Sequence, residues 1–232
     1  MKKYILSILF LVMFVVIYTA SVNFSVITSS SNVKSAGPVI VIDAGHGGVD
    51  GGAVASDGTN EKDINLDIAL KLNELMKLNG FSTVMTRTED ISIHDDDATT
   101  IRQKKVSDLK KRLSILDDGD ALCMISIHQN IYSSSKYSGT QVFYGKNNTL
   151  SETLADSIQN QVVTLMQPDN KRAIKQTTKD IYLLYNAQKP CVMVECGFLS
   201  NQEELSNLKD DEYQTKMAFA VFVGFLEYYN DL

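Results

Sequence analysis

Five short runs of apolar, often β-branched residues recur along the chain. They lie at residues 39–43, 82–86, 122–127, 140–144 and 191–195. The apolar character of each run is nearly continuous, which is typical of strands buried on both faces in a mainly parallel sheet. The pattern therefore predicts five strands with a layer of helix on either side.

Amphipathic segments alternate with these runs. Residues 61–79, 150–166 and 211–229 place apolar side chains at helical spacing, and Gly80 supplies a stop for the first of them. Its stripe consists of Ile64, Ile68, Leu72, Leu75 and Met76. Residues 117–120, DDGD, lack most ligands of a calcium loop and are interpreted as a helix-to-strand turn. Together the elements predict one α/β domain over residues 38–232, a mainly parallel twisted sheet with helices on both faces.

The segment before residue 38 has a different character. Residues 4–22 carry no charge and follow two lysines, which predicts a signal anchor or signal peptide over residues 1–22. No convincing cleavage site follows, so a retained anchor is favoured. Residues 23–37 are small and polar, as expected of a flexible linker. We therefore expect an exported, extracytoplasmic domain held at the membrane.

Composition narrows the function classes only slightly. Of the 232 residues, 44% are hydrophobic and 22% charged, which is ordinary for a globular protein. The net charge of -6 argues against nucleic acid as a partner, because nucleic-acid binding needs clustered Lys and Arg. Three cysteines are too few for a disulfide framework.

Polar residues stand where predicted strands end. His46 follows residues 39–43, His128 closes the run 122–127 and Glu195 closes the run 191–195. Asn60 is an expected helix N-cap, with Asp63 completing a variant capping box, so Glu61 begins the helix and faces the same edge. Ligands of open α/β sheets bind beyond the carboxyl ends of the strands.

This set of side chains has the chemistry of a catalytic zinc site. Two imidazoles, His46 and His128, and the carboxylate of Glu61 are predicted to bind Zn²⁺ and leave its fourth position open. The glycines around His46 let the backbone pass close to the metal. Glu195 remains as a general base that takes a proton from water and returns it to a leaving amine. The sequence therefore predicts amide hydrolysis.

Five motifs in this order resemble the zinc-dependent N-acetylmuramoyl-L-alanine amidases of bacterial cell walls. They are VIVIDAGHGGVDGGA, EKDINLDIALKLNELM, STVMTRTED, SIHQN and CVMVECGFLSN. The resemblance covers residues 38–232. It implies zinc ligands at His46, Glu61 and His128, a catalytic Glu195, and a mainly parallel sheet flanked by helices. It also implies cleavage of the amide between N-acetylmuramic acid and L-alanine in peptidoglycan glycan strands that carry stem peptides.

The short architecture is most similar to the subgroup that prepares muramic-δ-lactam in the cortex of bacterial spores. That similarity implies an enzyme acting between the forespore membranes. Residues 138–180 leave no room for the inserted helix that plugs the zinc site in some family members. Control through an extracytoplasmic protein partner that stabilises zinc binding is therefore a further hypothesis.

Several other residues are candidates for contact with the substrate. Arg87 and Asp90 match a recurrent pattern of the family, and they are expected either to pair with each other or to reach the substrate. Asn130 is a candidate for orienting a ligand or the substrate. Arg172 and Lys175 are candidates for binding an anionic stem peptide.

Two alternative functions are compatible with the same residues. One is a zinc carboxypeptidase or endopeptidase that cuts within the stem peptide. The other is a non-catalytic wall-binding protein of the same fold, although a binding protein would have little use for Glu195.

Overall fold

The computed structural model describes residues 37–232. The predicted anchor and all but the last residue of the predicted linker lie outside these described residues. Within residues 37–232, no helix combines the length and the apolar character needed to cross a membrane.

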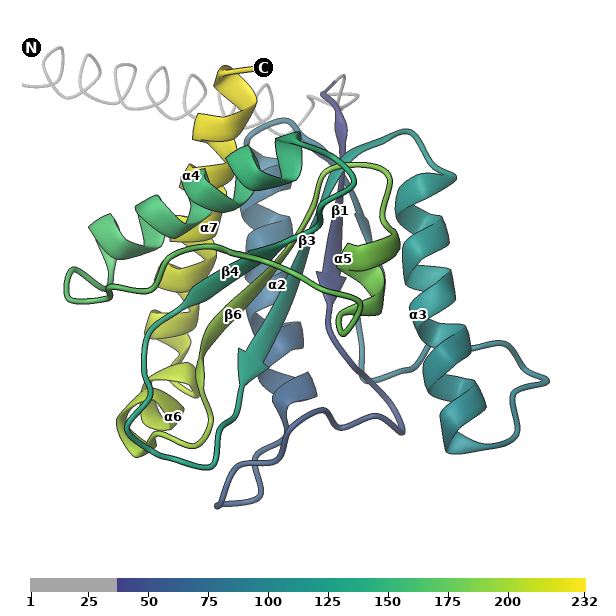
Figure 1. Cartoon of the computed structure of the whole chain (residues 1–232), viewed down its shortest axis with the longest axis horizontal. Coiled ribbons are helices and arrows are strands. Elements are labelled where there is room, and N and C mark those ends of the chain that lie inside the picture. Colours follow the sequence, from purple (N-terminus) through teal and green to yellow (C-terminus); the bar gives the residue numbers. More distant parts are fainter. Residues whose placement is uncertain (1–36) are drawn as a thin grey trace, which may run out of the picture. The chain divides into compact units, whose positions relative to one another are not determined.

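Six strands form one sheet in the order β2-β1-β3-β6-β4-β5. The four labelled in Figure 1, β1, β3, β6 and β4, lie side by side in its middle. Their bounds are β1 Val39–Ala44, β2 Ser82–Met85, β3 Ala121–Asn130, β4 Gln141–Tyr144, β5 Lys175–Gln176 and β6 Cys191–Phe198. Strands β1, β2, β3 and β6 run parallel, β4 runs antiparallel to β6, and β5 runs parallel to β4. The five predicted strands and the mainly parallel sheet are confirmed. The exposed, two-residue β5 was not predicted.

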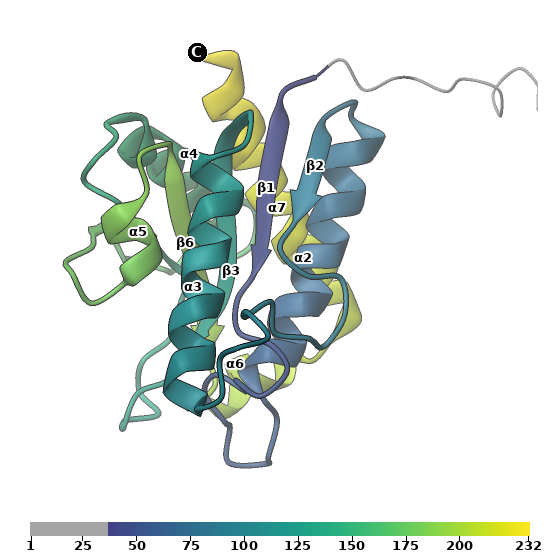
Figure 2. The same ribbon diagram turned by 90° about the vertical axis from the view of Figure 1, so that its right-hand side faces the viewer.

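Helices cover both faces of the sheet, as predicted (Figure 2). Their bounds are α2 Glu61–Leu78, α3 Ile101–Asp117, α4 Leu150–Leu165, α5 Tyr182–Asn186, α6 Gln202–Leu208 and α7 Asp211–Asn230. Helices α2, α4 and α7 pack on one face, where α7 lies between the other two. Helices α3 and α5 pack on the opposite face.

The strands bury apolar side chains on both faces, which explains their continuous apolar character. In β1, Ile40 and Ile42 point to the larger core under α2, α4 and α7, whereas Val41 points to the smaller core under α3 and α5. From the predicted stripe of α2, Ile68, Leu72 and Met76 are fully buried. Burial on both faces fixes the strand registers that place the functional side chains at one edge.

Helix α3 was not predicted, and its buried side is partly charged. Its buried residues are Asp108, Arg112 and Leu116, spaced four apart, so two of the three inward positions are charged. Val106, Leu109, Leu113 and Leu116 do recur at helical spacing, but Val106 and Leu109 are exposed, so this apolar pattern does not mark the buried side of the helix. The predicted turn at residues 117–120 is confirmed, because α3 ends at Asp117 and β3 begins at Ala121.

The start of α2 confirms one prediction and corrects another. Glu61 is the first helical residue and Asn60 the N-cap, but the Asn60 side chain makes no capping hydrogen bond. The predicted capping box is therefore wrong. Loop carbonyls take its place: the Glu61 N–H donates to the Ala53 oxygen at 2.8 Å and the Lys62 N–H to the Gly51 oxygen at 3.2 Å. These bonds satisfy amides that the first helical turn leaves without internal partners.

Candidate metal centre

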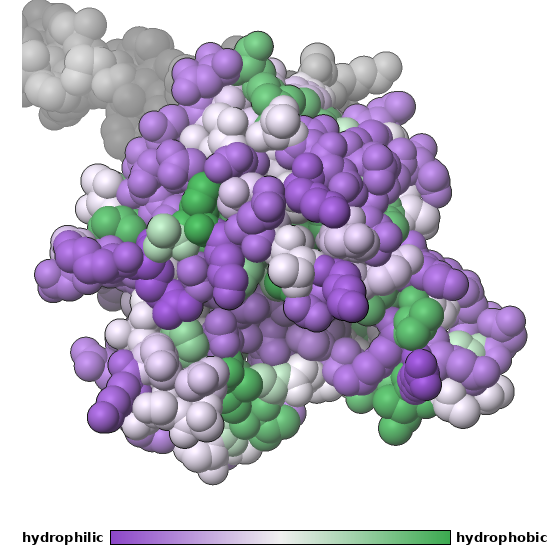
Figure 3. Space-filling model, in the orientation of Figure 1, coloured by the Kyte–Doolittle hydropathy of each residue, from purple (hydrophilic) through white to green (hydrophobic). Residues whose placement is uncertain are grey.

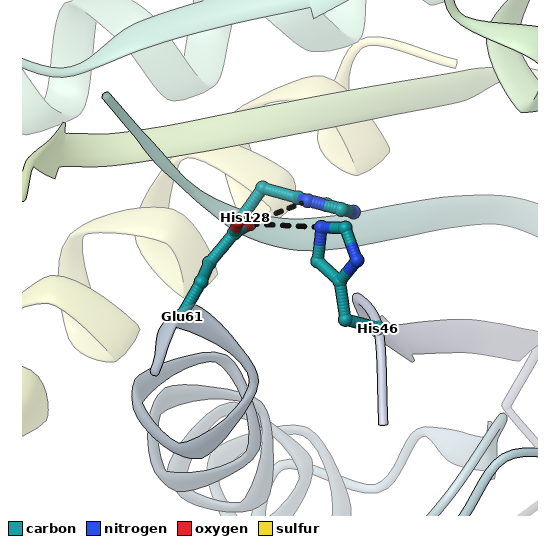
Figure 4. Close-up of side chains that lie close together, drawn as sticks. All are labelled: His46, Glu61 and His128. Atoms are coloured by element: carbon teal, nitrogen blue, oxygen red, sulfur yellow. Dashed lines mark hydrogen bonds and ion pairs between the residues drawn. The ribbon is translucent and has the colours of Figure 1, made fainter. Parts of the chain in front are cut away.

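The three predicted metal ligands converge at the carboxyl edge of the sheet (Figure 4). One potential donor atom from each of His46, Glu61 and His128 lies within 4.8 Å of the others. Glu61 Oε1 is 3.3 Å from His46 Nε2 and 2.8 Å from His128 Nδ1. A tetrahedral zinc ion with bonds of about 2.0–2.2 Å keeps its ligand atoms about 3.4 Å apart. The donor set therefore fits one such ion.

Backbone and side-chain amides hold the Glu61 carboxylate in place. Its Oε2 accepts a hydrogen bond from the Ala53 N–H at 2.9 Å. Its Oε1 accepts from the Gln129 N–H at 3.1 Å and from Asn65 Nδ2 at 3.2 Å. Burial alone would raise the pKa of Glu61, but the hydrogen bonds with His128 and His46 and the charges of both rings together outweigh it and hold that pKa well below its usual range. The group is therefore an anionic donor.

Asp50 orients the His46 ring, and the sequence reasoning missed it. Its Oδ2 lies 3.0 Å from His46 Nδ1, while its Oδ1 forms an ion pair with Lys105 Nζ at 2.8 Å. A carboxylate on one ring nitrogen fixes the tautomer and directs the other nitrogen to the metal. Burial would lower the pKa of His46, but the hydrogen bonds with Asp50 and Glu61 raise it to about 9. The only sequence signal is a carboxylate four residues after the histidine.

Replacing Asp50 with Asn is expected to weaken zinc binding by about 10- to 100-fold, the usual cost of losing a residue that supports a ligand. Competition titration of the full-length chain against a chelator of known affinity measures the change. Asp57→Asn removes a charge from the same loop, where Asp57 pairs at the surface with Lys209, and should keep wild-type affinity. Equal affinities of Asp50→Asn and the wild type would contradict the assignment.

Two buried arginines hold the backbone that carries His46. Arg112 donates to the carbonyl oxygens of Ala44 at 2.8 Å and His46 at 2.6 Å. Arg87 donates to those of Ala44 at 2.9 Å and Gly45 at 3.0 Å. Among the described residues, His46 is the one non-glycine residue with a positive φ, at 62°. Such a conformation is costly for a residue with a side chain, so these bonds stabilise the turn that presents the ligand.

The buried carboxylate of Asp43 holds Arg112 in place. Asp43 Oδ1 accepts from Arg112 Nη1 at 2.5 Å and from Thr86 Oγ1 at 2.8 Å, and its Oδ2 accepts from Ser126 Oγ. Arg112 Nε also donates to Asp108 at 2.5 Å. Burial would raise the pKa of Asp43, but the charges of Arg112 and His128 and the hydrogen bonds from Ser126 and Thr86 together outweigh it and lower that pKa to about 2. The charged stripe of α3 therefore serves the His46 turn.

Two glycines make room for the candidate ligand side chains. A Cβ at Gly45 would lie 2.2 Å from His128 Nε2, and a Cβ at Gly52 would lie 2.6 Å from Glu61 Oε2. Gly52 also has a φ of +70°. A larger residue at either position would displace the His128 or the Glu61 side chain.

Glu195 lies beside the three donors without joining them. It is the register partner of His128 in the parallel pair of β3 and β6, so the two side chains leave the same face of the sheet. Its Oε2 is buried and has no hydrogen-bond partner among residues 37–232. Burial raises the pKa of Glu195 to about 7, against the lowering effect of the His128 charge. A carboxyl with this pKa can both take and return a proton near neutral pH.

The remaining predicted residues occupy different surroundings. Arg87 is 3% exposed, and its hydrogen bonds to backbone carbonyls favour a structural role over substrate contact. Asp90 forms its ion pair with Lys62 at 2.6 Å. Arg172 lies close enough to Glu195 for its charge to lower the pKa of that group. Lys175 is exposed on β5. Asn130, at the end of β3, is partly buried near the centre.

The surface above this edge is hollowed. In Figure 3 the lower part of the domain divides into two lobes, with hydrophilic residues in the hollow between them and hydrophobic residues on both flanks. A pocket of about 220 Å³ lies on the α3 and α5 side of the centre, with both histidines in its wall. The centre is thus reachable from solvent and lies between walls of mixed polarity.

Comparisons with known proteins agree with this geometry. Residues 40–227 match the family model described as N-acetylmuramoyl-L-alanine amidase. The germination-specific N-acetylmuramoyl-L-alanine amidase of Bacillus subtilis (strain 168) is 33% identical over 195 residues, which cover 84% of this chain and 81% of that protein.

Solved structures agree as well. The CwlD amidase from Clostridioides difficile, in complex with the GerS lipoprotein, is 41% identical with a TM-score of 0.81, over 84% of this chain and all of that one. An N-acetylmuramoyl-L-alanine amidase from Clostridium difficile 630 is 28% identical with a TM-score of 0.72, over 84% of this chain and 97% of that one.

Proposed function

The chain belongs to the N-acetylmuramoyl-L-alanine amidase family and is a peptidoglycan amidase, and from this premise we propose that it is a zinc enzyme. His46, Glu61 and His128 are the proposed ligands, and Glu195 is the proposed general base. One observation carries the proposal: donor atoms of three side chains converge within 4.8 Å of one another. Glu195 lies next to them as the register partner of His128.

The donor set suits zinc better than a harder cation. Two imidazole nitrogens and one carboxylate oxygen form a common catalytic zinc site, whereas magnesium and calcium take mainly oxygen ligands. The chemistry that zinc supplies when bound is a lowered pKa for its water and polarisation of a carbonyl oxygen.

The residues of the chain supply the proton transfers. Glu195 takes the proton of the attacking water and then gives it to the nitrogen of the L-alanine residue, so that the stem peptide leaves as a free amine. The unpartnered Oε2 of Glu195 is the atom available for both transfers. Asp50 and the arginine bonds to residues 44–46 keep the His46 ring and its backbone fixed meanwhile.

The test uses the purified full-length chain with peptidoglycan and mass spectrometry of the products. Removal of metal by a chelator is expected to stop hydrolysis, and zinc is expected to restore it. The expected products are stem peptides with a free alanine amine and glycan strands with free lactyl carboxylates. Shortened stem peptides would instead identify a carboxypeptidase or endopeptidase. Full activity after complete metal removal would overturn the zinc proposal.

We also propose that the substrate is spore-cortex peptidoglycan, where this cleavage precedes muramic-δ-lactam formation. The germination-specific name of the Bacillus subtilis relative supports this role. An exported enzyme between the forespore membranes, held by residues 1–22, would fit it. Expression in sporulating cells that lack their own such amidase is expected to restore the lactam in cortex digests. Cortex without lactam, despite active enzyme, would contradict this role.

An extracytoplasmic protein partner that stabilises zinc binding is part of the same proposal. It is supported by the similar CwlD amidase, whose structure contains the GerS lipoprotein. The purified chain alone is then expected to hold less than one zinc ion per molecule. Stoichiometric zinc and full turnover by the chain alone would remove the need for a partner.

A further inference from the structure

A large cavity lies on the Glu195 side of the metal centre, outside the three-donor cluster. Its volume is about 670 Å³, which is within the usual range for ligand sites. The β3–β4 connection, the chain after α4 and helix α6 form its walls, and these segments lie on one side of the domain in Figure 1. Lys136, Tyr137, Lys171, Arg172 and Glu203 are among its lining residues.

A row of side chains connects the centre to this cavity. His128 on β3 is the register partner of Glu195 on β6, and Glu195 is the register partner of Gln141 on β4. Residues in register leave the same face of a sheet. Arg172 Nη2 then donates to Gln141 Oε1 at 2.5 Å. The row therefore runs from the metal centre, through the general base, to a guanidinium in the cavity wall.

The proposed proton transfer gives the bound substrate a direction. Because Glu195 returns the proton to the leaving nitrogen, the peptide that starts at this nitrogen extends on the Glu195 side. Two strand spacings from β3 to β4 are about 10 Å. An extended peptide advances about 3.3–3.6 Å per residue. The third residue of a stem peptide therefore reaches Gln141 and Arg172, whereas a single alanine does not.

The cavity carries both signs of charge, since its lining includes Lys136, Lys171 and Arg172 as well as Asp169, Glu203 and Glu204. The basic group at the end next to the sheet, Arg172, is the one available to a peptide carboxylate. Arg172 stacks with its guanidinium carbon 5.0 Å from the Phe198 ring centroid, and its Nε is buried without a hydrogen-bond partner among the described residues. Within residues 37–232, neither Lys136, Lys171 nor Arg172 forms an ion pair. Both oxygens of the nearby Glu204 are instead taken by backbone N–H groups of Gly139 and Phe198.

We propose that this cavity is a subsite for the distal part of the stem peptide, where Arg172 and Lys171 pair with its carboxylates. The inference rests on the proposed function, because that mechanism sets the direction of the peptide. It makes the length and charge of the stem peptide determinants of specificity. A guanidinium held by Gln141 and stacked on Phe198 is already oriented for a carboxylate.

The test compares defined substrates with the full-length, zinc-supplemented chain. N-acetylmuramic acid is linked either to alanine amide, to a tripeptide with free carboxylates, or to the same tripeptide with its carboxylates amidated. We expect kcat/KM for the charged tripeptide to exceed that for each of the other two by about tenfold or more, as for hydrogen bonds between charged groups. Equal values for all three would overturn the subsite and leave the amidase mechanism standing. Cleavage of none would count against the proposed function itself.

Variants locate the effect. Arg172→Met is expected to reduce the preference for the charged over the amidated tripeptide by about tenfold, mainly through KM. Lys171→Met is expected to reduce the same preference by about two- to fivefold, as for an exposed charge pair. This variant tests the subsite if Arg172→Met does not fold. The preference is the ratio of kcat/KM for the charged tripeptide to kcat/KM for the amidated one. A change that slows the chemical step for both substrates therefore cancels in this ratio. Lys110→Met, on exposed α3 surface, should keep the wild-type preference. An unchanged preference in the Lys171 and Arg172 variants would contradict the proposal.

Discussion

Glu195→Gln is expected to reduce hydrolysis by about 10²- to 10⁴-fold, the usual contribution of a general acid–base group. Glutamine has nearly the same shape as glutamate but cannot take a proton from water or give one to the leaving amine. Since Glu195 lies outside the three-donor cluster, zinc affinity is expected to stay within about threefold of wild type, a difference of less than one kcal/mol. The two quantities are measured on the same preparation, by turnover of a muramoyl tripeptide and by chelator competition.

This test is specific for a general base because it expects turnover to fall while zinc affinity stays the same. A residue that only supported the fold would change zinc affinity and turnover together. Glu212→Gln provides the matched control, because Glu212 lies on the exposed start of α7 and pairs with Lys216. Turnover by Glu195→Gln within threefold of wild type would exclude the role assigned to Glu195. Loss of zinc together with turnover would instead place Glu195 among the groups that hold the ligands.

The sequence could bring the candidate site residues together because the relevant information is local. A parallel strand buried on both faces has a continuous apolar run, and its last residue marks the carboxyl edge of the sheet. His128 and Glu195 are therefore placed by the ends of their apolar runs, and the structure puts them in register on adjacent strands. The strands themselves continue past these residues, β3 to Asn130 and β6 to Phe198. Glu61 follows from the start of one amphipathic helix. Three local patterns and one rule about sheet edges suffice for these positions.

The supporting residues could not be found in this way, because their partners are distant in sequence. Arg112 is 66 residues from His46, whose carbonyl it binds, and 69 residues from Asp43. A charged residue on a polar helix predicts an exposed position, yet this one is 2% exposed. The charge of the buried Arg112 guanidinium finds its partner only once the sheet brings Asp43 beneath α3. Tertiary pairing, which no local pattern encodes, decides its role.

The direction of β4 also lies beyond local patterns. Residues 141–144 have the same apolar character as the other strands, but β4 runs antiparallel to β6. This reversal matters for function, because it sets Gln141 next to Glu195 and brings Arg172 to the edge of the centre. The family's motifs mark the proposed metal ligands, whereas the surroundings of the proposed peptide subsite emerge only from the strand register.

His128→Ala is expected to remove zinc binding, with affinity falling by more than roughly 100-fold, the upper end of the cost of losing a supporting residue. Position 128 suits the test because it lies in regular β3, whereas His46 has a left-handed backbone. Zinc at 100 times its dissociation constant stabilises a protein by about 2.7 kcal/mol. For a domain of this size that corresponds to a rise in Tm of about 5–10 °C, measured by calorimetry with and without zinc. His128→Ala should show no such rise.

The third histidine supplies the control for this experiment. His94 lies outside the donor cluster, and its Nδ1 is 2.8 Å from Ser92 Oγ. His94→Ala removes the same imidazole and should retain both the zinc-dependent rise in Tm and the turnover. The comparison separates loss of a ligand from loss of any histidine, because both variants change the chain by the same atoms. A zinc-dependent rise in Tm for His128→Ala equal to that of the wild type would show that the ion binds elsewhere, and the assignment of all three donors would fail together.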